Sequence, residues 1–153
     1  MINEPRMITV HLETHTDAPP ETVWSSLTND IGDWWGEPYV SSAERTALTL
    51  DARPGGLLFE DWGDGNGNAW ATVRTLRKPN RLEFDGTFMM YGAIHGTVAI
   101  TIEPQPDRRT RIALIQQAIG EINDDTIDAW NAGWQDLIDS LINHCNEKLG
   151  SDK

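Results

Sequence analysis

The stretch that decides the fold lies near the end of the chain and reads DDTIDAWNAGWQDLIDSLINHCNEKL from Asp124 to Leu149. Its apolar side chains recur every three or four residues, which is the spacing of one face of an α-helix. Asn123 or Asp124 can cap the first turn, and Gly150 is placed to end the helix after Lys148. One continuous surface must cover the apolar stripe, which comprises Ile127, Trp130, Trp134, Leu137, Ile138, Leu141 and Cys145.

The segments before this helix indicate that the covering surface is an antiparallel sheet. Residues 8–17 begin with alternating apolar and polar side chains, Ile8, Val10 and Leu12 on one face, as a half-buried strand does. Turns rich in glycine, proline, asparagine and aspartate punctuate the middle of the chain, and short connections imply antiparallel neighbours. The remaining strands are expected near residues 45–51, 56–61, 68–77, 80–88, 95–104 and 109–118.

Two short helices are expected between the first strand and the second. Proline suits the first helical position, so Pro19-Pro20 favours a helix that carries Val23, Trp24 and Leu27. A second short turn carries Ile31, Trp34 and Trp35, with Thr28 or Asn29 as its N-cap.

These elements predict an α+β fold in which a seven-stranded curved antiparallel sheet wraps around the long C-terminal helix, an arrangement called helix-grip. We expect one domain over residues 1–153, with flexible ends at about 1–6 and 150–153. The helix should cover one end of the sheet well and leave a pocket at the other end.

Composition and charge narrow the possible partners. The net charge of −12 disfavours nucleic acid and anionic membranes. The single cysteine excludes an intrachain disulfide, and no signal peptide or membrane-spanning run is evident. We therefore expect a cytoplasmic protein, as a monomer or homodimer.

The chain offers no convincing catalytic or metal-binding motif, and we expect no cofactor. Cys145 falls within the apolar stripe, where a thiol is unreactive. Glu60, Glu83 or Gln116 can face the pocket, depending on the strand register.

Aromatic residues are the strongest candidates for ligand contact, because seven tryptophans is several times the ordinary usage. Aromatic faces bind flat apolar ligands, and an indole N–H can orient a polar group. At any one position a core role competes with this interpretation. The predicted ligand-binding residues are Trp34, Trp35, Phe59, Trp70, Phe84, Phe88, His95, Trp130 and Trp134.

Four segments resemble a known family, in the expected order and over nearly the whole chain. APPETVW (18–24) is similar to the opening of the helix-grip, START-like (SRPBCC) proteins related to the birch pollen allergen and the steroidogenic lipid-transfer domains. DWWGEP (33–38), RPGG (53–56) and GWQDLIDSL (133–141) resemble the branch related to the activator of the heat-shock-protein ATPase.

The resemblance implies the same fold and several possible functions. Our leading hypothesis is binding of a small hydrophobic or aromatic ligand between sheet and helix. The first alternative is a chaperone-related or other protein-interaction module, and the second alternative is a cyclase- or aromatase-like enzyme. We expect a binding protein rather than an enzyme.

Overall fold

The computed structural model describes residues 4–36, 39–40, 47–88, 90 and 92–151. Strand β1 (Arg6–Thr16) comes first, followed by two short helices, α1 (Pro20–Thr28) and α2 (Ile31–Trp34). Six strands and a long helix then follow: β2 (Ala47–Leu50), β3 (Leu57–Gly63), β4 (Asn66–Arg77), β5 (Arg81–Gly86), β6 (Ile94–Pro104), β7 (Thr110–Gly120) and α3 (Asp124–Ser151).

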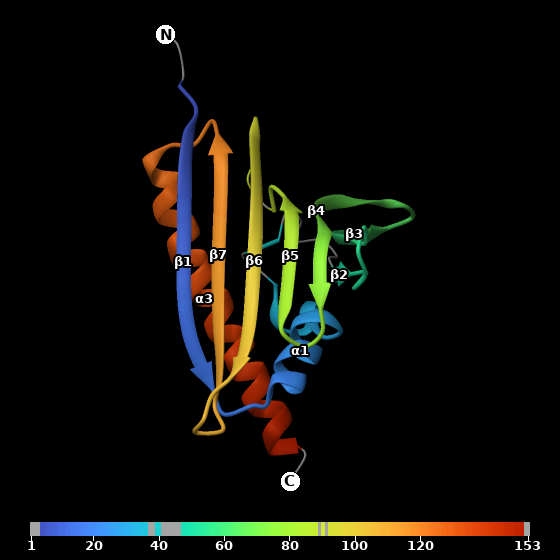
Figure 1. The fold of residues 1–153 in the computed structure, drawn as a ribbon. Helices are drawn as coiled ribbons and strands as arrows, with labels where there is room; N and C mark the ends of the chain where they lie inside the picture. Colours follow the sequence, from blue (N-terminus) through green and yellow to red (C-terminus); the bar gives the residue numbers. More distant parts are fainter. Residues whose placement is uncertain (1–3, 37–38, 41–46, 89, 91, 152–153) are drawn as a thin grey trace.

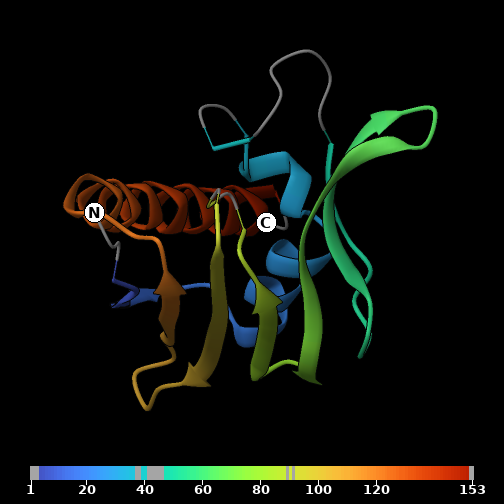
Figure 2. The same ribbon diagram turned by 90° about the horizontal axis from the view of Figure 1, so that it is seen from above.

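The seven strands form one antiparallel sheet in the order β1-β7-β6-β5-β4-β3-β2. Consecutive strands pair from β2 to β7, and β1 returns to pair with β7, so β1 and β2 are the two edges. Helix α3 crosses behind the sheet in Figure 1, and Figure 2 shows it lying along one face. The predicted helix-grip architecture is confirmed.

Residue alternation separates an inner face, which packs against α3, from an outer face. On β6, Val98, Ile100 and Ile102 are buried, whereas Ala99 and Thr101 between them are only half-buried. The same period places further aliphatic side chains of β1 and β7 inside, because neighbouring strands share their pleat. These include Ile8, Val10, Ile112 and Leu114.

The structure confirms one predicted helix end and corrects two others. Asn123 is the N-cap of α3, since its Oδ1 accepts a hydrogen bond of 2.9 Å from the backbone N–H of Thr126. Gly150 does not end this helix, which continues to Ser151. Asp30, rather than Thr28 or Asn29, is the N-cap of α2. Thr28 belongs to α1, where its hydroxyl donates to the carbonyl of Trp24.

In the part of the chain that the structure describes, no helix has both the length and the apolar character of a membrane span.

Candidate functional site

Aromatic rings fill much of the space between the inner face of the sheet and α3. Their contacts join centroids that are 5.3 to 6.4 Å apart, within the range of favourable aromatic pairs. Trp35 and Phe88 are central, with four such contacts each. The aromatic cluster contains seven of the predicted ligand-binding residues: Trp34, Trp35, Trp70, Phe84, Phe88, Trp130 and Trp134.

Two predicted residues lie apart from this cluster. His95 is exposed on the outer face, next to Gly96, which is buried on the inner face. Phe59 alternates with buried Leu58 and Glu60, and its cross-strand neighbours are the exposed residues Thr49 and Ala69. Both side chains therefore face away from α3, because successive residues of a strand point to opposite faces.

A pocket of about 180 Å³ remains where α3 meets the segment after α2. We call it the aromatic pocket. Most of the cluster lies behind it and is buried, but Trp130 is only half-buried. The lining is Trp35, Tyr39, Ala129, Trp130, Gly133, Trp134 and Leu137.

Tyr39 forms one wall of the pocket, and Gly133 explains how it fits there. A Cβ at position 133 would lie 3.2 Å from Cε1 of Tyr39, which is closer than ordinary packing. Glycine therefore lets the tyrosine ring lie against α3. The Tyr39 hydroxyl donates to Asp136, and this bond raises the pKa of Tyr39. The indole N–H of Trp35 donates to the Tyr39 carbonyl at 2.7 Å.

Two buried polar side chains lie behind the rings. Glu60 is fully buried, and its Oε2 accepts a 2.8 Å hydrogen bond from the indole of Trp70. Gln116 is also buried and accepts a 2.7 Å bond from the indole of Trp134. Glu83 lies on the outer face in an ion pair with Arg81. The strand register, which the sequence left open, turns Glu60 and Gln116 toward the inner face and Glu83 toward the outer face.

A second polar group links α3 to the junction of α1 and α2. Ligand atoms of Asp30, Asp33 and His144 lie within 4.8 Å of one another, a spacing that could hold a metal ion. However, the Lys148 ammonium already lies 2.8 Å from Asp30 Oδ2 and 3.1 Å from the Ser25 hydroxyl. The hydrogen bond from Lys148 lowers the pKa of Asp30 below its usual value, and the hydrogen bond from His144 lowers it further by a smaller amount. We therefore interpret the group as an ion-pair cluster, which sequence spacing alone does not reveal.

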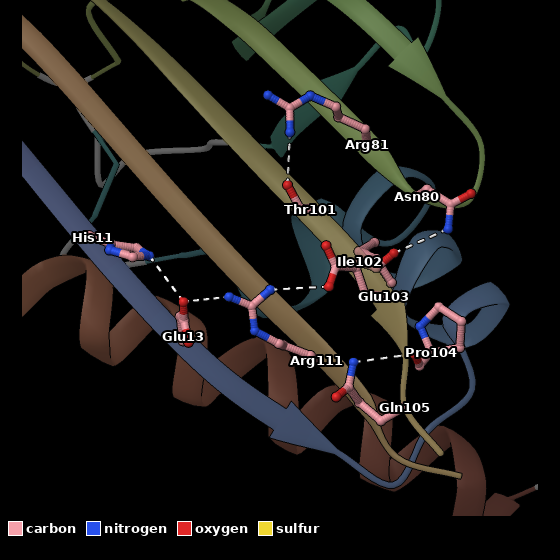
Figure 3. A network of polar contacts seen from close by, with 10 residues as sticks. All are labelled: His11, Glu13, Asn80, Arg81, Thr101, Ile102, Glu103, Pro104, Gln105 and Arg111. Atoms are coloured by element: carbon pink, nitrogen blue, oxygen red, sulfur yellow. Dashed lines mark hydrogen bonds and ion pairs between the residues drawn. The ribbon is translucent and has the colours of Figure 1, made fainter. Parts of the chain in front are cut away.

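The outer face of the sheet carries a more exposed network, shown in Figure 3. Glu13 on β1 accepts from Arg111 on β7 and lies 3.3 Å from His11. Arg111 also donates to Glu103 at 3.3 Å. Charged pairs of this exposure stabilise little, and they are typical of a solvated sheet face.

The single cysteine, Cys145, is a potential nucleophile, but it is buried. Cys145 has no exposed surface, and burial raises the pKa of its thiol. A protonated thiol is a poor nucleophile, so the geometry supports a structural role.

Comparison with solved structures supports the fold. The chain is similar to an uncharacterized protein from Rhizobium leguminosarum, with 18% identity, a TM-score of 0.70, and coverage of 96% of this chain and 99% of that one. It is also similar to SA2116 from Staphylococcus aureus, with 14% identity, a TM-score of 0.71, and 96% and 98% coverage. CalU16 from Micromonospora echinospora gives 15% identity, a TM-score of 0.61, and 97% and 90% coverage.

A search of curated protein sequences gives no match. The family described as "Activator of Hsp90 ATPase homolog 1-like protein" matches residues 17–145. This range includes α1, α2, six of the seven strands and most of α3. The chain therefore belongs to the family of activator of Hsp90 ATPase homolog 1-like proteins.

Proposed function

We propose that this protein binds a small hydrophobic or aromatic molecule in the aromatic pocket. The observation that carries the proposal is the pocket itself, an apolar hollow of about 180 Å³ walled by Trp35, Tyr39, Trp130 and Trp134. Sites for small molecules are concave and mostly apolar, with a few polar groups that orient the ligand. Tyr39 and the half-buried indole of Trp130 are suited to that orienting role.

Binding is favoured over catalysis by what lines the pocket. Among the described lining residues, Tyr39 is the one that titrates, and its bond to Asp136 raises its pKa further from neutrality. A general base works best with a pKa near the working pH. The buried side chains of Glu60 and Gln116 do not line the pocket, and they accept hydrogen bonds from the indoles of Trp70 and Trp134.

An interaction surface is the second candidate, supported by a different observation. Met7, Ile115 and Ile119 are 62%, 41% and 50% exposed on the outer face of β1 and β7. Met7 and Ile119 are cross-strand neighbours. Exposed apolar side chains that lie side by side, as Met7 and Ile119 do, can mark a site where another protein binds.

The test is a titration of the protein with a panel of aromatic and aliphatic compounds, in which tryptophan fluorescence and calorimetry measure binding. We expect saturable binding that is lost in Trp130→Leu, which removes a pocket wall but keeps an apolar side chain. Trp62→Leu is the matched control, because Trp62 lies on β3, is 38% exposed and does not line the pocket. Binding that survives Trp130→Leu, or that disappears equally in both variants, would contradict the proposal.

A further inference from the structure

The rings that wall the aromatic pocket pack against one another at large angles, so they form a corner and not a pair of parallel faces. Trp35 and Trp134 are 5.6 Å apart and nearly perpendicular, at 87°. Trp130 and Trp134 are 6.0 Å apart and tilted by 48°. Rings that meet at large angles can contact one compact group on more than one side, which is how proteins recognise quaternary ammonium groups.

The size of the pocket points the same way. Its volume is about 180 Å³. An apolar cavity of about 150 Å³ accommodates benzene, so this pocket suits one group of roughly that bulk. The ligand, or the part of it that enters, is therefore compact.

The electrostatic environment favours a positive charge on that group. Tyr39, which forms one wall of the pocket, donates a hydrogen bond from its hydroxyl to the Asp136 carboxylate. Helix α3 carries one lysine, Lys148, which is already paired with Asp30. Against it stand six acidic residues on the same helix: Asp124, Asp125, Asp128, Asp136, Asp139 and Glu147. Arg6 pairs with Asp124 at the start of the helix, and the chain as a whole has a net charge of −12.

Aromatic faces attract cations through their quadrupole, and tryptophan does so most strongly. An anionic ligand would be repelled by the surrounding field. From the angled rings, the volume and the acidic surroundings, we infer that the aromatic pocket accepts an alkylated ammonium group, such as the trimethylammonium head of a small organic cation. This inference rests on the proposed function, because it specifies the ligand class of the same pocket.

The experiment compares two probes of the same shape. One is choline, and the other is its neutral analogue, in which carbon replaces the nitrogen. Calorimetry gives their affinities, and the indole N–H signals in NMR spectra locate the site. We expect choline to bind about tenfold more tightly, as a partly desolvated cation–π contact allows. Trp130→Leu should abolish this preference and Trp62→Leu should preserve it.

Asp136→Asn tests the electrostatic part separately. It should weaken choline binding several-fold and leave the affinity for the neutral analogue unchanged, because only the cation senses the lost charge. Equal changes for both probes would mean that Asp136 acts by positioning Tyr39, and the argument from charge would be wrong.

The other outcomes separate this inference from the proposed function. If the two probes bind equally well, or if neither binds while a neutral aromatic compound from the panel does, the inference fails and the proposed function stands. If no compound binds at all, both fail.

Discussion

The two halves of α3 lie over the rest of the protein in different ways. In the C-terminal half, residues 138–151, the apolar stripe is buried completely at Ile138, Leu141 and Cys145. In the N-terminal half, residues 124–137, Trp134 and Leu137 are buried as well, but Ile127 and Trp130 are only half-buried, and the aromatic pocket opens beside Trp130. One continuous stripe thus packs tightly at one end and leaves a hollow at the other.

The cause is the partner surface that each half meets. Polar contacts tie the C-terminal half to α1, α2 and the junction between them, including Ser140 to the Trp34 carbonyl and Lys148 to Asp30. The N-terminal half meets the aromatic cluster through Trp130 and Trp134, and the aromatic pocket remains between these rings and Tyr39. We therefore propose that the C-terminal half mainly stabilises the fold and that the N-terminal half provides room for a ligand.

The largest expected effect is at Trp134, where the two roles meet. Trp134→Ala removes a buried ring that contacts Trp35, Phe88 and Trp130, and it leaves the Gln116 carbonyl without its indole donor. We expect the free energy of unfolding to fall by about 3–5 kcal/mol. Urea denaturation measures this change. A loss below about 1 kcal/mol would show that the cluster repacks easily and is not rigid.

Matched isoleucine substitutions compare the two halves directly. Ile138→Ala in the C-terminal half should cost about 2–4 kcal/mol, because Ile138 is buried in the main core. Ile127→Ala in the N-terminal half should cost about 1 kcal/mol, because Ile127 is only partly buried beside a smaller cluster. Both values come from urea denaturation. Equal costs would remove the proposed difference between the halves.

A smaller effect, with a definite pH dependence, is expected at Asp30. Its pKa is lower in the folded protein than its ordinary value of about 4. Its contribution to stability is therefore complete above that value and is lost as the pH falls through the folded pKa. Asp30→Asn should cost about 1 kcal/mol at neutral pH, since the hydrogen bonds from Lys148 and His144 weaken.

The check is the free energy of unfolding of both proteins at a series of pH values. The difference between them should shrink as the solution is acidified below pH of about 4, because the wild-type carboxylate becomes protonated. A difference that stays constant over the acid range would mean that the charge of Asp30 contributes nothing.

Sequence reasoning predicted the fold better than the site, and α3 illustrates why. The spacing of its apolar residues is a local property, so Ile127 through Cys145 could be assigned to one face without knowledge of the sheet. The register that turns Glu60 and Gln116 inward, and Phe59 and His95 outward, depends on where each strand begins and on an irregularity between Leu58 and Phe59. A shift of one residue reverses every side chain, and turn chemistry alone does not exclude it.

The contribution of Tyr39 also lay beyond the sequence pattern. No periodicity connects Tyr39 with Gly133, which are distant in the chain and meet only in the folded protein. The one available signal was the cost of a glycine within a helix, which requires a compensating contact. The structure provides that contact in the ring of Tyr39.

Gly133→Ala therefore gives the smallest expected effect on stability and the sharpest separation of stability from binding. Alanine favours the helix by about 1 kcal/mol over glycine. The new Cβ would lie 3.2 Å from the Tyr39 ring, which must move by a few tenths of an ångström. Tyr39 is only half-buried and can move, so the free energy of unfolding should rise by about 0.5 kcal/mol or less.

The same substitution narrows the aromatic pocket, so the affinity for a ligand in that pocket should fall several-fold. Gly150→Ala is the control, because a Cβ there meets no atom within 4 Å, and it should leave binding unchanged. Undiminished affinity in Gly133→Ala would show that the ligand does not depend on the space between Tyr39 and α3, and the role assigned to the N-terminal half would be wrong.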